Sequence, residues 1–255
     1  MPPRKIARYG WNPDLPDHRD IKYSAVRPIL VTLPPMVDLR SKCPPVYDQG
    51  QIGSCTANSI GAAFEFELLK QGLKDFKPAR LFIYYNERTM EGDVMSDGGA
   101  QIRDGVKSVA QLGVCNETKW PYDPKILFKK PTKTCYKAAL SNLVQQYVSI
   151  DNTDINQLKS CLADGNPFVF GFTVYQSFES PQVAQTGILA MPLPGESTVG
   201  GHAVLAVGYD DSKNAFIVRN SWGAGWGLAG YFYMPYAYIT SKDLATDFWV
   251  LKLVE

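Results

Sequence analysis

The chain has 255 residues, enough for one large domain or for two compact lobes that share an interface. A hydrophobic content of 45% and a charged content of 20% are those of an ordinary globular protein. The net charge of +1 argues against nucleic acid or an anionic membrane surface as a partner, and no apolar run is long enough to cross a bilayer. We therefore expect a globular monomer with neither a nucleic-acid nor a membrane partner.

Residues 1–35 contain many of the prolines and show little periodicity. The first residues (MPPRK) are not followed by the apolar stretch of a secretory signal, so we expect an intracellular, cytoplasmic location. Scattered aromatic and aliphatic side chains predict an extended arm that docks on the rest of the chain. We interpret residues 1–35 as an N-terminal arm and a possible short pro-segment, with a cut near residues 34–37. A permanent arm on the surface is the alternative.

Residues 36–140 are expected to form a mainly helical lobe. Apolar side chains recur at helical spacing from Ala57 to Leu68, with Glu65 elsewhere on the helical wheel, so we expect an amphipathic helix that ends at Gly72. The spacing predicts further helices over residues 81–88 and 102–112.

Residues 141–255 are expected to form a mainly β lobe. Residues 168–175 are rich in aromatic and β-branched side chains and predict a strand, and residues 154–163 predict a short helix before it. Residues 202–209 and 215–220 flank a polar turn, which predicts a hairpin. A helical half followed by a sheet half indicates an α+β protein with two lobes.

Cys55 follows a glycine-containing stretch and is expected in the first turn of the helix that begins there. Unpaired backbone N–H groups and the positive end of the helix dipole favour a thiolate at that position. They can also stabilise negative charge on a substrate carbonyl. Taken alone, the stretch fits a buried cysteine at the start of a core helix equally well.

The predicted hairpin supplies a possible base for this cysteine. If its turn centres on Ser212, Asn220 faces Val204, and His202 is its diagonal neighbour on the same face of the sheet. Diagonal neighbours are about 7–8 Å apart, close enough for side chains to meet, although a slip of one residue would separate them. A nucleophilic cysteine needs a base, and the base needs an orienting partner. The sequence therefore predicts a Cys–His–Asn site in which Cys55 rests as an ion pair with His202.

Three segments resemble those of papain-like (C1 family) cysteine proteases. Residues 49–57 (QGQIGSCTA) resemble the nucleophile segment, residues 201–209 (GHAVLAVGY) the histidine strand and residues 220–227 (NSWGAGWG) the asparagine segment. They occur in the family's order, and the resemblance covers most of residues 36–255. It implies a two-lobe fold with a helical left lobe, an antiparallel β-barrel-like right lobe and an active-site cleft between them.

The resemblance also implies roles for individual residues. Cys55 would be the nucleophile, His202 the general base and acid, and Asn220 its orienting partner. The Gln49 side chain and the Cys55 backbone N–H would form the oxyanion hole. Residues that would contact substrate are Gly98 and Gly99, which pair with its backbone, Gly201 beside the histidine, Trp222 over the His–Asn contact, and Asp247. If Asp247 faces the main pocket, it would favour a basic substrate residue; a surface aspartate is the alternative.

The chain departs from the family at several positions. Ile52 and Ser96 stand where the family usually has the two cysteines of a disulfide, and Thr56 stands where it has tryptophan. Four cysteines besides Cys55 would allow two bridges, but their irregular spacing favours free thiols. We expect no metal and no cofactor.

We therefore predict a cysteine-type peptidase, a hydrolase of the EC 3.4.22 type. It would act as an endopeptidase on peptides or proteins through a thioester acyl-enzyme. The N-terminal segment would inhibit it in a zymogen. Two alternatives are a catalytically silent papain-like protein that only binds peptides, and another Cys–His acyl transferase of the transglutaminase-like kind.

Overall fold

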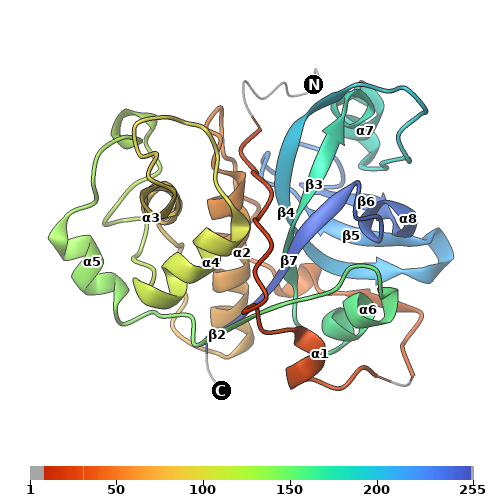
Figure 1. Cartoon of the computed structure of the whole chain (residues 1–255), viewed down its shortest axis with the longest axis horizontal. Helices are drawn as coiled ribbons and strands as arrows, with labels where there is room; N and C mark the ends of the chain where they lie inside the picture. The colour runs from red at the N-terminus through yellow and green to blue at the C-terminus, as the bar shows by residue number, and fades with distance from the viewer. Residues whose placement is uncertain (1–8, 31, 254–255) are drawn as a thin grey trace.

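The structure is a computed structural model that describes residues 9–30 and 32–253. Residues 1–8 and 31 of the expected arm, and residues 254 and 255, lie outside the described part. Four helices gather on one side of the molecule in Figure 1: α2 (Cys55–Lys70), α3 (Arg80–Glu91), α4 (Ile102–Gln111) and α5 (Lys133–Ala139). Four others are α1 (Tyr23–Val26), α6 (Ile155–Ala163), α7 (Pro181–Thr186) and α8 (Tyr236–Ile239). Single 3₁₀ turns occur at Arg40–Lys42, Pro124–Ile126, Gln176–Glu179 and Asp211–Lys213.

The strands form one antiparallel sheet on the other side of the molecule (Figure 1). The strand order is β2-β7-β3-β4-β5-β6, and β1 pairs with the far end of β4. Their bounds are β1 (Met36–Asp38), β2 (Gln146–Ser149), β3 (Phe168–Tyr175), β4 (Thr198–Asp210), β5 (Ala215–Arg219), β6 (Tyr231–Pro235) and β7 (Ala245–Lys252). The α+β class with an antiparallel sheet, expected from the sequence, is confirmed.

Helix α2 lies at the centre of the molecule. It packs against α3 and α4 on one side and against β4 and β7 on the other, so every residue from Cys55 to Leu68 is buried. The expectation of an amphipathic helix is therefore wrong, because Glu65, which lies away from the apolar positions on the helical wheel, is buried as well. The burial of Glu65 is compensated by a hydrogen bond from the Tyr47 hydroxyl. Gly72, with a φ of 65°, follows the end of the helix as predicted.

The β4–β5 hairpin has the predicted register at its functional end. Leu205 faces Arg219 and Ala206 faces Val218, as a turn centred on Ser212 requires. The register shifts by one residue between Ala206 and Gly208. Nearer the turn, Gly208 faces Ile217 and Asp210 faces Ala215, so the hairpin turns about a point between Ser212 and Lys213 rather than on Ser212. The irregularity offsets this difference, and His202 and Asn220 keep the diagonal placement expected from the sequence.

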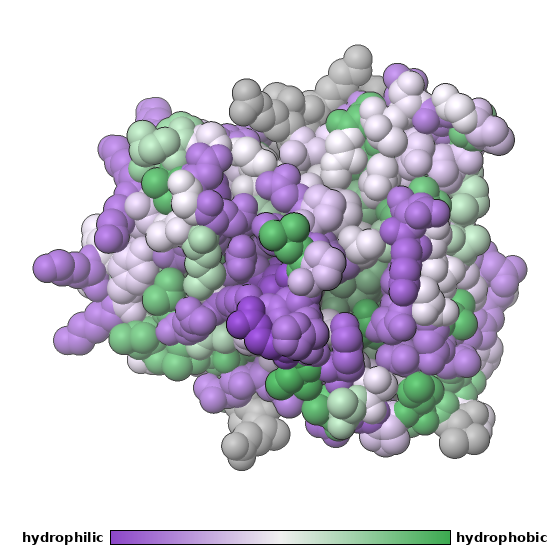
Figure 2. All heavy atoms as spheres, in the orientation of Figure 1, coloured by the Kyte–Doolittle hydropathy of each residue, from purple (hydrophilic) through white to green (hydrophobic). Residues whose placement is uncertain are grey.

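The N-terminal arm runs between the helices and the sheet (red in Figure 1). Trp11 N–H donates to the carbonyl of Gly201 on β4 at 3.0 Å, and Ala100 N–H donates to the carbonyl of Gly10 at 2.9 Å. Further along, Ser149 N–H donates to the carbonyl of Ile21 at 2.8 Å. In the same orientation, Figure 2 shows side chains covering the boundary between the helical half and the sheet half. The arm is thus bonded to both halves at once.

None of the five cysteines forms a disulfide, which agrees with the free thiols favoured by their spacing. Within residues 9–30 and 32–253, no helix combines the length and the apolar character needed to cross a bilayer.

Candidate active site

Cys55 begins α2 and is completely buried. Its Sγ accepts a hydrogen bond from the backbone N–H of Ala203 on β4 at 3.4 Å. The Ser59 hydroxyl, one turn further along α2, donates to the Ala203 carbonyl at 2.8 Å. Since Ala203 directly follows His202, these contacts bring the sulfur from the helical side next to the histidine of the sheet.

The imidazole of His202 is held in one tautomer by its neighbours. Ser221 N–H donates to Asn220 Oδ1 at 2.8 Å, which identifies Oδ1 as the acceptor end of that amide. His202 Nε2 lies 2.8 Å from the same oxygen and therefore carries the hydrogen of the neutral ring. Nδ1 is then unprotonated, and it has no hydrogen-bond partner among the described residues. A neutral His202 can accept a proton at Nδ1.

Aromatic side chains enclose the His202–Asn220 contact. The Trp222 ring lies 5.1 Å from the imidazole, and Phe178 lies 5.3 Å from Trp222 and 5.5 Å from Trp226. These rings exclude water, which strengthens the hydrogen bond beneath them. Trp222 therefore lies where the sequence predicted it, over the His–Asn contact.

Gln49 is buried beside the same group and is oriented by Ser221. Its backbone N–H donates to the Ser221 carbonyl at 2.9 Å, and its Oε1 accepts from the Ser221 hydroxyl at 2.6 Å. The second contact identifies Nε2 as the donor end of the amide. Here Nε2 donates one hydrogen to the Ile52 carbonyl at 3.0 Å. The structure thus brings Gln49, Cys55, His202 and Asn220 together.

Asp97 links the nucleophile loop to the predicted substrate-binding glycines. Both of its carboxylate oxygens accept the Gly53 N–H at 3.1 Å, and it accepts the Tyr84 hydroxyl at 2.7 Å. The Tyr84 oxygen in turn accepts Gly99 N–H at 3.1 Å. These bonds start one residue after Ile52 and Ser96, the positions of the missing cysteines, and they join the same two loops.

We predict that Asp97→Ala destabilises the protein by about 1–3 kcal/mol, because it leaves a backbone N–H and a buried hydroxyl without an acceptor. Urea unfolding measures the change. The control is Asp93→Ala, an exposed aspartate whose carboxylate accepts a hydrogen bond from the Ser96 hydroxyl. Equal stability of the two variants would contradict the assignment of this link to Asp97.

The arm lies against all five residues predicted to contact substrate. Gly99 has a φ of 85°, and a Cβ there would meet the Gly10 carbonyl oxygen at 2.5 Å. Gly201 accepts the Trp11 N–H, and the Gly98 carbonyl accepts the Asn12 side chain at 3.2 Å. The Tyr9 ring lies 6.3 Å from the ring of the fourth residue, Trp222.

The fifth of these residues, Asp247, also faces the arm. It has a φ of 61° in a β7 segment whose pairing with β3 is irregular, and its Oδ2 accepts Trp11 Nε1 at 2.9 Å. The indole of Trp11 packs directly on Gly171, where a Cβ would lie 2.0 Å from its ring. Asp247 is therefore half-buried against the arm, and the alternative of an ordinary surface aspartate is wrong.

Burial governs the charges of the site, and the arm adds one backbone hydrogen bond to the sulfur. Burial raises the pKa of the Cys55 thiol to about 12, although backbone N–H groups of Ala203 and Gly10 oppose the shift. Burial lowers the pKa of His202 to about 4, against the opposing effect of Asn220. In this arm-bound form both shifts favour a neutral thiol and a neutral imidazole over the resting ion pair expected from the sequence.

Two carboxylates face each other where the arm leaves the site. Asp247 Oδ2 accepts Asp14 N–H at 2.8 Å, and Asp14 accepts Arg103 N–H at 3.0 Å and Trp249 Nε1 at 2.9 Å. Burial and the charge of Asp247 raise the pKa of Asp14 to about 7, and burial raises the pKa of Asp247 as well. The Arg103 guanidinium forms a salt bridge with Asp20 at 2.6 Å rather than with either of these two carboxylates.

Comparison with known proteins identifies the family of this chain. A family model described as "Papain family cysteine protease" matches residues 33–247. The chain belongs to the papain family of cysteine proteases. It is 47% identical over 215 residues to the "Uncharacterized peptidase C1-like protein L477" of Acanthamoeba polyphaga mimivirus, a match that covers 81% of this chain and 69% of the relative.

Solved structures agree with this membership. The structure of xylellain, a cysteine protease from Xylella fastidiosa, superimposes with a TM-score of 0.90 at 46% identity and covers 100% of this chain and 99% of that one. Digestive procathepsin L 3 from Tenebrio molitor shares the fold, with a TM-score of 0.69 at 21% identity over 92% of this chain and 75% of that one. The chain spans 65% of the length of Cysteine proteinase 3 from Entamoeba histolytica, to which it is 28% identical. This papain-family protease is therefore a peptidase of the C1 type.

Sequence reasoning missed several residues of this papain-family site. Docking of the arm through aromatic side chains such as Tyr9 and Trp11 was predicted, but their partners and the close approach of Gly10 to Gly53 were not. The role of Asp97 was not predicted either, because its partners Gly53 and Tyr84 are distant in the sequence.

Proposed function

We propose that the protein is an endopeptidase in which Cys55 is the nucleophile, His202 the general base and acid, and Asn220 its orienting partner. The proposal rests above all on one observation. The Cys55 sulfur lies against the N–H that follows His202, while Asn220 holds the imidazole with an unprotonated Nδ1. That arrangement supplies both a nucleophile and a proton acceptor.

The reaction follows from these positions once a peptide replaces the arm. His202 Nδ1 takes the proton of Cys55, and the thiolate attacks the carbonyl carbon of the substrate. Gln49 Nε2 and the Cys55 N–H donate to the resulting oxyanion, each worth about 3–4 kcal/mol. His202 then gives its proton to the leaving amine, and a thioester remains on Cys55. Water, deprotonated by His202, hydrolyses the thioester and releases a carboxylic acid and the free thiol.

Product analysis tests this function against both alternatives. A peptide is incubated with the protein and a primary amine, and the products are identified by mass spectrometry. We expect two shorter peptides, one of which ends in a new carboxylate. Binding without cleavage would indicate a silent peptide-binding protein. Incorporation of the amine without cleavage would indicate a transglutaminase-like enzyme.

We further propose that the arm is an inhibitory pro-segment. It covers the predicted substrate-binding residues and presents the N–H of Gly10, rather than a carbonyl carbon, to the sulfur. The Gly10 carbonyl is bonded to Ala100 instead. A cut near residues 34–37 would have to break the pairing of β1 with β4. We therefore place the cut in the exposed residues 24–29.

The cellular setting is part of the same proposal. Five unpaired cysteines support a reducing, cytoplasmic location for a monomer. We also propose that the boundary between the helical and β lobes lies near residue 140, after α5.

The raised pKa of Asp14 predicts that the arm is held more tightly in acid. A carboxyl whose pKa is raised on docking favours the docked state below its ordinary pKa of 3.8. That contribution is lost as the pH rises toward about 7. In a Cys55→Ala chain, hydrogen exchange at the Trp11 and Asn12 amides, corrected for intrinsic rates, should accelerate over this range. Asp14→Asn should flatten the dependence; an unchanged slope would contradict this account.

We also propose that the pocket occupied by Trp11 selects substrate residues that end in a hydrogen-bond donor. Asp247 would accept from tryptophan, arginine or lysine there, and the absence of side chains at Gly171 and Gly201 leaves room for an indole. A peptide library varied at that position should show a preference of about tenfold for these residues over leucine, since a charged hydrogen bond is worth about 1.5–3 kcal/mol. Asp247→Asn should reduce the preference for arginine and lysine. Indifference of the wild type to all of them would remove the proposal.

A further inference from the structure

The loop of residues 49–55 carries both proposed oxyanion donors, and one hydroxyl joins its two ends. Tyr122, from the segment between α4 and α5, donates to the Gln49 carbonyl at 2.9 Å. The same hydroxyl lies 2.5 Å from Ser54 Oγ. Burial raises the pKa of Tyr122, so the hydroxyl keeps its proton. The reaction described above does not use this residue.

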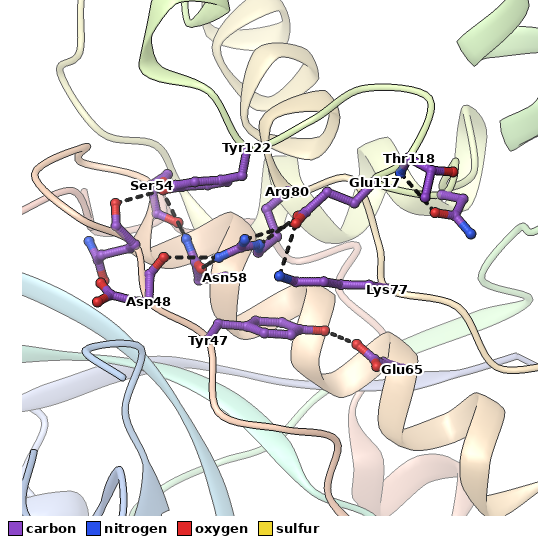
Figure 3. Close-up of polar contacts among 12 residues, drawn as sticks. Tyr47, Asp48, Ser54, Asn58, Glu65, Lys77, Arg80, Glu117, Thr118 and Tyr122 are labelled. Carbon is purple, nitrogen blue, oxygen red and sulfur yellow. Dashed lines mark hydrogen bonds and ion pairs between the residues drawn. The ribbon is translucent and has the colours of Figure 1, made fainter. Parts of the chain in front are cut away.

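Tyr122 is itself fixed by a buried cation. Arg80 at the start of α3 is 3% exposed, and its guanidinium lies between two rings, 3.9 Å from the centre of Tyr122 and 4.8 Å from that of Tyr47 (Figure 3). Glu117 accepts two hydrogen bonds from it, at 2.9 and 3.1 Å, and balances its charge. Such stacking holds a planar guanidinium and both rings in one arrangement.

The hydrogen bonds between Arg80 and Gln49 can run in only one direction. Arg80 Nη1 lies 2.8 Å from Asn58 Oδ1. Because arginine has only donors, this oxygen must be the acceptor. The Nδ2 of Asn58 must then donate to Ser54, at 2.9 Å to its carbonyl and 3.0 Å to Oγ. Because Tyr122 donates its single hydroxyl hydrogen to the Gln49 carbonyl, the Ser54 hydroxyl must donate to the Tyr122 oxygen. The chain of donors begins at Arg80 and ends at Gln49 (Figure 3 shows its first members).

We infer that Tyr122 is a positioning residue of the reaction, whose hydroxyl, oriented from Arg80 through Asn58 and Ser54, fixes the backbone of the residue that supplies the oxyanion donor. The inference rests on the proposed function, because it assigns Tyr122 to the Gln49 oxyanion donor. A bond to the Gln49 carbonyl anchors its main chain, while Ser221 orients its side chain. Together with the bond from the Gln49 N–H to the Ser221 carbonyl, these anchors hold Nε2 where it can donate to a developing oxyanion.

The test compares Tyr122→Phe with Tyr136→Phe, with every chain, the reference included, also carrying Gly10→Ala, whose Cβ would meet the Gly53 carbonyl oxygen and displace the arm from the site. The control removes a similar half-buried hydroxyl, which bonds Asn86 at 2.8 Å. A peptide aldehyde forms a hemithioacetal with Cys55 whose oxygen occupies the oxyanion position. We expect Tyr122→Phe to weaken aldehyde binding and to lower kcat by about 10–100-fold, with KM within about twofold of the reference chain. Alkylation of Cys55 by iodoacetamide forms no oxyanion and should change by less than about twofold.

Two outcomes would overturn the inference: unchanged aldehyde affinity, or an alkylation rate that falls as far as kcat. Ser54→Ala interrupts the same chain and should shift the measurements in the same direction, so a poorly folded Tyr122→Phe would not decide the matter. Failure of the proposed function would look different. The reference chain and Tyr136→Phe would then bind the aldehyde without cleaving any peptide, and aldehyde affinity would still test Tyr122.

Discussion

Gly10→Ala should activate the protein. A Cβ at this position would lie 1.7 Å from the Gly53 carbonyl oxygen. Gly53 cannot give way without breaking its bond to Asp97, and Gly10 cannot give way without breaking its bond from the Ala100 N–H. Overpacking of this kind costs about 3 kcal/mol, which corresponds to an increase of about 100-fold in the population with the arm displaced. We expect both peptide cleavage and Cys55 alkylation at neutral pH to accelerate by about that factor.

The matched control is Gly195→Ala. Gly195 has a positive φ of 80°, which Gly10 does not share, and nothing lies within 4 Å of a Cβ placed there. This variant tests a glycine-to-alanine change without a clash against the arm's docking site and should leave both rates unchanged. If Gly10→Ala cleaved peptides no faster than Gly195→Ala, the arm would not be the inhibitor.

Cys55→Ala should abolish peptide cleavage, with a loss of about 10⁴-fold or more, because the nucleophile is removed. His202→Ala should cost nearly as much, since the two residues act as a unit and their effects do not add. The rates are best measured in the Gly10→Ala background, where the covered state does not mask them.

Cys161→Ala is the appropriate comparison for the cysteine substitution. Cys161 is also completely buried, and its sulfur donates to the Asn166 carbonyl within the turn that ends α6. This variant should keep its peptidase activity, even where its stability falls. Comparable loss of cleavage in Cys161→Ala and Cys55→Ala would mean that cleavage depends on packing rather than on a nucleophile.

The local parts of this site could be predicted from the sequence. The helix that begins at Cys55 and the hairpin that carries His202 and Asn220 are each specified by a short pattern. The hairpin register at His202 and Asn220 agrees with the prediction because the shift between Ala206 and Gly208 offsets a turn that is centred half a residue beyond Ser212. The family resemblance then fixed the order of the segments.

The parts that could not be predicted depend on tertiary contacts. Glu65 lies away from the apolar positions on the helical wheel, and only the packing of α2 between helices and sheet buries it. The link from Asp97 to Gly53 and the contact of Tyr122 with Gln49 join residues 44 and 73 positions apart. The hydrophobic periodicity of a sequence carries no information about pairs so far apart. The ionisation of Cys55 depends in the same way on an arm whose docking site only the fold defines.

The central claim is that His202 activates Cys55 and that the arm prevents it. Site-resolved iodoacetamide labelling of the five cysteines across pH, in Gly10→Ala with and without His202→Ala, tests it most directly. We predict that only Cys55 reacts rapidly below about pH 6, well under the ordinary thiol pKa of about 8.5, and that His202→Ala removes this reactivity. If Cys55 titrated like an ordinary thiol in both chains, the account would be contradicted.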